Sequence, residues 1–88
     1  MTNFIDIWNN IIANEGNLFY TIKGKEFTYK VNGNKIITSR TSRNITKNDI
    51  EKAFNLLPLT GPSVINNLVQ GPSYVWSILN DKRIKNKQ

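Results

Sequence analysis

The dipeptide Asn32-Gly33 lies between two segments in which apolar and polar residues alternate. Alternation with a period of two is typical of a strand with one buried face, and residues 26–31 have this pattern. Asn-Gly is favoured in two-residue type I′ turns because both central positions need a positive φ. The segment therefore predicts an antiparallel hairpin that turns at this dipeptide and pairs Tyr29 with Ile36.

Residues 18–22 alternate in the same way and are expected to form a further strand. Leu18, Tyr20 and Ile22 share one face, so the pattern predicts that they point into the core and that Phe19 points outward. Joined to the hairpin, this strand predicts a three-stranded antiparallel meander.

Helical patterns precede and follow the strands. Residues 2–15 place large apolar residues, Trp8 among them, along one helical face that we expect to be buried. Further on, Thr46 has the features of the N-cap of a second helix, and Ile45 is positioned to pack onto its first turns. Pro58 is expected to close this helix.

The last third contains a ten-residue echo, in which Gly-Pro-Ser opens both residues 61–70 and residues 71–80. Glycine breaks the preceding element, proline presets φ for a first helical turn, and serine can cap it. The echo predicts two short helices. Tyr74 and Trp76 could line a peptide-binding groove, but so small a protein needs such residues in its core.

These elements predict one α+β domain over residues 1–81: an N-terminal helix, a three-stranded antiparallel meander, then three C-terminal helices packed on the sheet. A chain of 88 residues has no length for a second core of useful size. Residues 82–88 are basic and polar, which is typical of a flexible C-terminal tail.

The residue types present argue against several functions. The chain contains no histidine and no cysteine, and its six acids show no pairing suited to a metal or an acid and base couple. We therefore expect no metal, no cofactor and no enzymatic activity. Without an apolar run of about 18 residues or a secretory signal, we expect no membrane span and a cytoplasmic location.

The formal net charge of +6 is concentrated in the middle of the chain. Residues 23–47 hold seven basic side chains against Glu26, which is +7 and −1 and gives +6 for this segment. Segregated charge creates a local field that attracts polyanions.

The predicted function is therefore a small nucleic-acid-binding module, with DNA expected rather than RNA, that contacts the phosphate backbone through a basic loop and the hairpin turns. Arginine forks and short hydroxyl donors suit phosphate oxygens, and the start of a helix favours an anion. The alternative is a solvated connection with capping residues. The candidate binding residues are Arg40, Arg43, Lys47, Ser42, Lys23, Lys25, Lys35 and Lys30.

A second hypothesis from another class is a protein-interaction module, such as a small inhibitor or accessory protein. It would act through the Gly-Pro-Ser helix pair, with Tyr74 and Trp76 as the aromatic contacts. A homodimer is also open, because a sheet of three strands leaves edges that a second copy could pair with.

Overall fold

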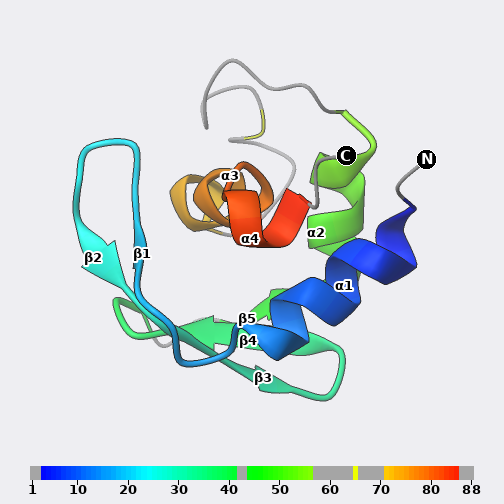
Figure 1. Ribbon diagram of the computed structural model, residues 1–88, viewed down its shortest axis with the longest axis horizontal. Coiled ribbons are helices and arrows are strands. Elements are labelled where there is room, and N and C mark those ends of the chain that lie inside the picture. Colours follow the sequence, from blue (N-terminus) through cyan, green and yellow to red (C-terminus); the bar gives the residue numbers. More distant parts are fainter. Residues whose placement is uncertain (1–2, 42–43, 57–64, 66–70, 86–88) are drawn as a thin grey trace.

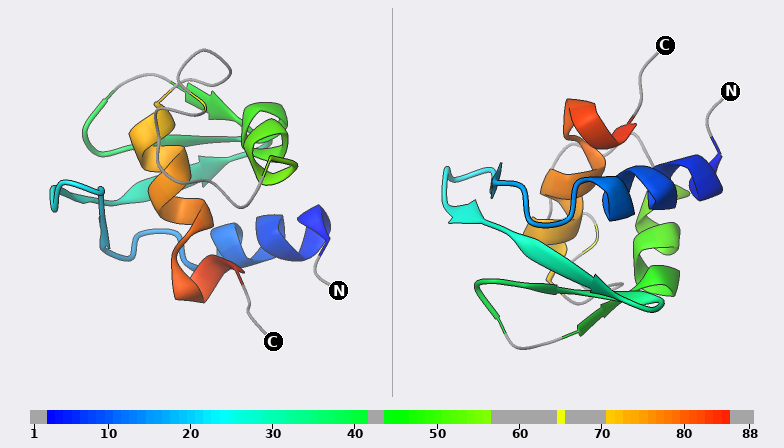
Figure 2. Two further views of the ribbon diagram at one scale, coloured as in Figure 1. Left: turned by 90° about the horizontal axis from the view of Figure 1, so that it is seen from above. Right: turned by 60° about the horizontal axis from the view of Figure 1, so that its bottom comes forward.

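Helices and a small sheet form two layers in the computed structural model, which describes residues 3–41, 44–56, 65 and 71–85. The described helices lie on one side of the three-stranded sheet β3-β4-β5 (Figures 1 and 2). This arrangement confirms the α+β class, with a helix before the sheet and helices after it. In chain order the elements are α1 (Phe4–Ala13), β1 (Phe19–Tyr20), β2 (Glu26–Phe27), β3 (Tyr29–Asn32), β4 (Lys35–Thr38), β5 (Asn44–Thr46), α2 (Lys47–Phe54), α3 (Pro72–Leu79) and α4 (Lys82–Lys85).

Helix α1 starts where local sequence predicts a start. The Asn3 side chain caps it by accepting a hydrogen bond of 3.0 Å from the Asp6 backbone N–H. Its apolar face is buried, and Trp8 belongs to the core as expected. After the helix, Gly16 adopts a φ of 85° and donates its N–H to the Tyr29 carbonyl, which ties the end of α1 to β3.

The β3-β4 hairpin forms as predicted, but its register is different. Asn32 pairs with Lys35 and Tyr29 pairs with Thr38, so Gly33 and the residue after it form the turn. The predicted pairing of Tyr29 with Ile36 is therefore wrong by two residues. Because side chains alternate with a period of two, a shift of two residues leaves the buried faces unchanged.

The third strand of this sheet is β5, not the segment at residues 18–22. In β5, Ile45 pairs with Ile36, and both side chains are fully buried. The sequence predicted residues 44–46 as part of a connection, because a strand of three residues is too short to show alternation. Residues 18–22 instead contribute β1, which pairs with β2 in a separate two-stranded hairpin.

The faces of β1 are the reverse of the prediction. Phe19 is 1% exposed, whereas Leu18, Tyr20 and Ile22 are 42%, 55% and 52% exposed. Phe19 pairs with Phe27, and the two ring centroids lie 5.8 Å apart. Phe19 joins an aromatic cluster with Phe27 and Tyr29. Because this cluster forms only in the folded chain, the alternation of residues 18–22 does not by itself show which face is buried.

Helix α2 begins as predicted. The Asp49 N–H donates to Thr46 Oγ1 at 3.1 Å, so Thr46 is the N-cap. The predicted end of the helix at Pro58 lies outside the described residues.

The second Gly-Pro-Ser copy forms α3, but serine does not cap it. Gly71 is the N-cap residue, with a left-handed φ of 58° and no side-chain cap. A Cβ at Gly71 would lie 3.1 Å from Ile45 Cδ1 and 3.1 Å from Tyr74 Cδ2, so both the backbone and the packing need glycine. The helix predicted for the first copy falls outside the described residues, apart from Ile65, which is fully buried.

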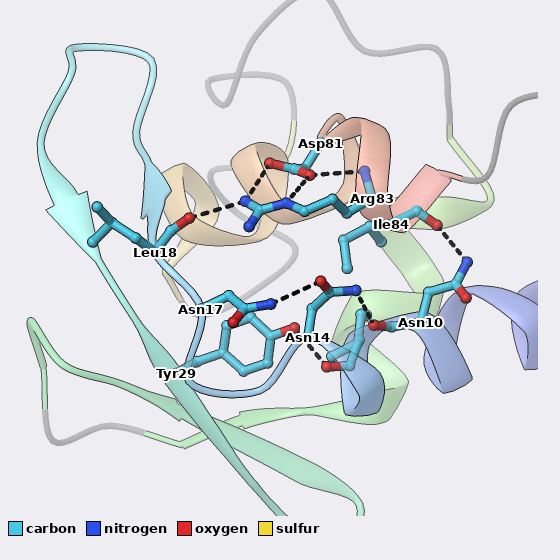
Figure 3. Close-up of polar contacts among 9 residues, drawn as sticks. Asn10, Asn14, Asn17, Leu18, Tyr29, Asp81, Arg83 and Ile84 are labelled. Atoms are coloured by element: carbon cyan, nitrogen blue, oxygen red, sulfur yellow. Dashed lines mark hydrogen bonds and ion pairs between the residues drawn. The ribbon is translucent and has the colours of Figure 1, made fainter.

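The chain after residue 81 differs from the predicted flexible tail, because residues 82–85 form α4. Ile84 is fully buried, and Asn10 of α1 donates its side-chain N–H to the Ile84 carbonyl at 2.9 Å (Figure 3). The sequence did not predict this buried contact, because Ile84 is a single apolar residue among basic ones and shows no periodicity. Residues 86–88 lie outside the described part of the chain.

Candidate functional site

The sheet has a face that none of the described helices covers (Figures 1 and 2). Along the strands, buried side chains that face the helices alternate with exposed or half-buried ones. Cross-strand pairs place Lys30 beside Ile37 and Lys35 beside Thr46. We call the resulting surface the outer sheet face; it comprises Glu26, Thr28, Lys30, Asn32, Lys35, Ile37, Ser39, Asn44 and Thr46.

A hollow of about 260 Å³ lies where β2 meets the end of β4. Arg40 lines it and donates its Nε–H to the Glu26 carbonyl at 2.7 Å, which fixes the guanidinium beside β2. Thr28 and Ser39 also line it and are joined by two hydrogen bonds, of 3.0 and 2.8 Å. The exposed side of Leu18 completes the lining. Cationic, hydroxyl and apolar groups therefore meet in one place.

A second hollow, of about 180 Å³, adjoins the first because Thr28 and Ser39 line both. Lys30 and Ile37, which are cross-strand partners, stand on its other side. The two neighbouring hollows therefore bring Arg40 and Lys30 to either side of the Thr28–Ser39 pair.

A larger hollow, of about 740 Å³, lies at the opposite end of the sheet. The β3-β4 turn and the first turn of α2 line it, and the Lys47 N–H donates to the Asn34 carbonyl at 2.7 Å. Lys35 and Lys47 therefore share this hollow, with Glu51 also on its wall. The Lys47 ammonium lies 5.6 Å from the centre of the Trp8 ring, an attractive cation–π contact that directs it toward α1.

The predicted binding residues thus do not gather in one loop. Lys35 is the first residue of β4, and Arg40 lies just beyond its last residue. Five residues of extended chain span up to about 17 Å, so the two side chains lie at different ends of the sheet. Lys23 and Lys25 are exposed at the tip of the β1-β2 hairpin. Arg43 and Ser42 lie outside the described residues.

The two aromatic residues of the alternative hypothesis pack against the protein itself. Tyr74 is half-buried and meets the Phe27 ring edge-on, with centroids 5.0 Å apart. Trp76 is also half-buried and packs on the hydrophobic core. Both positions agree with the expectation that a small core needs these side chains.

Two residues of interest, Tyr20 and Arg83, lie elsewhere than the sequence pattern predicts. The alternation predicts Tyr20 in the core, but Tyr20 is exposed because Phe19 pairs with Phe27 and takes the buried side. The only signal for this in the sequence is that a buried Phe19 could pair with Phe27. Arg83 was assigned to a flexible tail, yet its guanidinium donates to both Asp81 carboxylate oxygens and to the Leu18 carbonyl (Figure 3). This bonding holds the pKa of the Asp81 carboxyl below its usual value and raises that of Arg83.

Neither a metal site nor a membrane span is found in the part of the chain that the structure describes. Its acids do not form a group of three that could hold a metal ion. Its helices include none that is both long enough and apolar enough to cross a bilayer. Comparison with protein-family models, with curated proteins and with solved structures found no match to this chain.

Proposed function

We propose that this protein is a small nucleic-acid-binding module and that it contacts its ligand with the outer sheet face. The observation that carries the proposal is the composition of this face. Lys30 and Lys35 project from it, Arg40 lies at its end, and threonine, serine and asparagine side chains fill the space between them. Glu26 is the one carboxylate in the set of side chains that defines it.

Such a face suits a phosphate backbone for physical reasons. Lysine and arginine neutralise phosphates and release condensed counterions, while short hydroxyl and amide side chains donate hydrogen bonds that fix the ligand's position. An antiparallel sheet commonly has one solvated face, and surface charges of both signs are usual there. Together with Arg40 at its end, this face carries three basic side chains against one carboxylate, and this positive balance is what favours a polyanionic ligand. A cytoplasmic location is part of the same proposal.

The proposal predicts salt-dependent binding that depends on where a charge is removed. Labelled DNA duplexes and single strands are titrated with protein at two salt concentrations, and binding is followed by fluorescence anisotropy. The variant Lys30→Ala/Lys35→Ala should weaken binding and reduce the log-log salt slope by up to about 1.8 on a duplex, because each lost phosphate contact contributes about 0.9.

The matched control is Lys82→Ala/Lys85→Ala, which removes the same charge from exposed positions of α4, on the helical side of the molecule (Figure 1). It should retain most of the affinity and of the slope. Equal losses of affinity in the two double variants would show that binding depends on overall charge and not on the outer sheet face. No binding at low salt would refute the proposal.

A further inference from the structure

An apolar row of three exposed side chains, Leu18, Tyr20 and Ile22, lies in and around β1 at the end of the outer sheet face. Leu18 and Tyr20 are alternate residues of this extended segment and project to the same side, opposite to the buried Phe19, while Ile22 lies in the turn that follows. Single exposed apolar residues are normal, whereas exposed apolar side chains that lie together are a feature of contact surfaces. In Figure 1 the hairpin that carries them extends away from the three-stranded sheet, beside α3.

Strand register links this row to the outer sheet face. Tyr20 pairs with Glu26 in the β1-β2 hairpin, and the Glu26 carbonyl accepts the hydrogen bond from Arg40. Leu18 lines the same hollow as Arg40 and Ser39. Tyr20 is therefore the cross-strand partner of the residue whose carbonyl anchors the Arg40 guanidinium.

Cations flank the row on both sides. Lys23 and Lys25 are exposed in the turn that contains Ile22, where the Thr21 N–H donates to the Lys25 carbonyl at 2.8 Å. Arg40 and Lys30 follow on the other side, along the two adjoining hollows. An exposed aromatic ring between positive groups suits a ligand whose flat aromatic groups can stack on the ring and whose anionic backbone can contact the cations.

We infer that the preferred ligand is a single-stranded nucleic acid, DNA or RNA, and that one of its unpaired bases stacks on Tyr20. This inference rests on the proposed function. Bases in a duplex are already stacked and paired, so an aromatic ring on a short strand would find no base to contact there, whereas an unpaired base exposes its face. Leu18 and Ile22 provide apolar contacts beside the ring, and Arg40 and the lysines neutralise the adjacent phosphates.

Glu26 should disfavour this ligand, because it is the exposed cross-strand partner of Tyr20 and its negative side chain shares a face with the ring. A negative group at the centre of an anion site raises the cost of binding. If the base stacks on Tyr20, Glu26→Gln should bind single strands more tightly than the natural protein. This increase in affinity is the opposite of the loss expected when a residue needed for binding is replaced.

The test uses a thymidine oligonucleotide of about 12 nucleotides, a matched RNA, a duplex, and an abasic oligonucleotide with the same number of phosphates. Tyr20→Thr keeps a residue suited to a strand but removes the ring, and Tyr20→Phe keeps the ring. We expect Tyr20→Thr to weaken binding to the single strands by about fivefold or more and to leave the affinity for the abasic oligonucleotide nearly unchanged. Tyr20→Phe should leave the affinity for every ligand nearly unchanged. Because Tyr20 is exposed, the thermal melting of both variants should stay close to that of the natural protein.

The outcomes separate this inference from the proposed function. If thymidine and abasic strands bind equally and Tyr20→Thr has no effect, while Lys30→Ala/Lys35→Ala still weakens binding, the base-stacking site is refuted and the nucleic-acid interface remains. Tighter binding to the duplex than to either single strand also refutes it. If sedimentation shows a dimer that Tyr20→Thr dissociates, the row is a contact between two copies. An Ile5→Ala control removes an exposed apolar residue from α1 and should alter neither binding nor assembly.

Discussion

The guanidinium of Arg83 lies over the Phe19 ring, with its Cζ 4.1 Å from the ring centroid. A residue near the C-terminus thereby packs on the first strand and, through its hydrogen bonds to Asp81 and to the Leu18 carbonyl, fastens α4 to β1 (Figure 3). The same strand carries Tyr20 on its other face. The clamp at Arg83 thus supports the hairpin on which the proposed base-stacking site stands.

Replacing Arg83 should destabilise the fold. Arg83→Ala removes a two-oxygen contact with Asp81, a bond to Leu18 and the ring contact, with an expected loss of about 1 to 2 kcal/mol given the partial exposure of the pair. Urea denaturation followed by far-ultraviolet circular dichroism measures the loss. Lys82→Ala is the control, since Lys82 is an exposed neighbour. A loss no greater than that of the control would show that the clamp does not stabilise the fold.

Stability should fall in acid partly through Asp81. Its pKa is lowered in the folded protein by hydrogen bonds from Arg83, so the unfolded chain binds a proton more readily than the folded one. This contribution is complete above the unfolded pKa of about 3.9 and is lost as the pH falls through the folded value. Thermal melting from pH 7 to pH 3 should show the natural protein converging with Asp81→Asn. In an Arg83→Ala background the convergence should be weaker, and an unchanged convergence there would exclude Arg83 as the cause.

Glycine at position 71 should be required for two separable reasons. Gly71→Ala places a residue with a Cβ at a φ of 58° and brings that Cβ within 3.1 Å of Ile45 and Tyr74 side-chain atoms. Gly33→Ala provides the matched control, because its φ is 64° and nothing lies within 4 Å of the added Cβ. The backbone cost, about 1 to 2 kcal/mol, applies to both variants, and the packing cost applies to Gly71→Ala alone. Equal losses in denaturant titrations would show that the core accommodates the methyl group.

The Thr38 hydroxyl should be dispensable for stability. Its Oγ1 is buried, with no hydrogen-bond partner among the described residues, and the side chain is 3% exposed. Burying an unpaired hydroxyl is unfavourable, so Thr38→Val, which has a similar shape, should raise the free energy of unfolding by about 1 kcal/mol. Calorimetry of the two proteins measures the difference. A lower melting temperature for Thr38→Val would mean that the hydroxyl is satisfied in solution.

Features that depend on neighbouring residues were predictable. The cap at Thr46, the start of α1 and the burial of Trp8 follow from local propensity and helical periodicity. The hairpin between β3 and β4 was also predictable, although its turn lies one residue further along than the Asn-Gly signal indicated. The charge of residues 23–47 identified the basic segment. It did not predict that the strands would distribute the basic side chains along a sheet face.

The sequence by itself determined the α+β class, the capped helices, the central hairpin and the excess of basic groups, because each depends on residues only a few positions apart. Tertiary structure decided which face of β1 is buried, which segment completes the three-stranded sheet, and how Arg83 and Ile84 hold the end of the chain. These outcomes depend on contacts between distant residues, such as Phe19 with Phe27 and Ile45 with Ile36. The free energy of such contacts outweighs local pattern, and it is what leaves Tyr20 exposed beside the basic face.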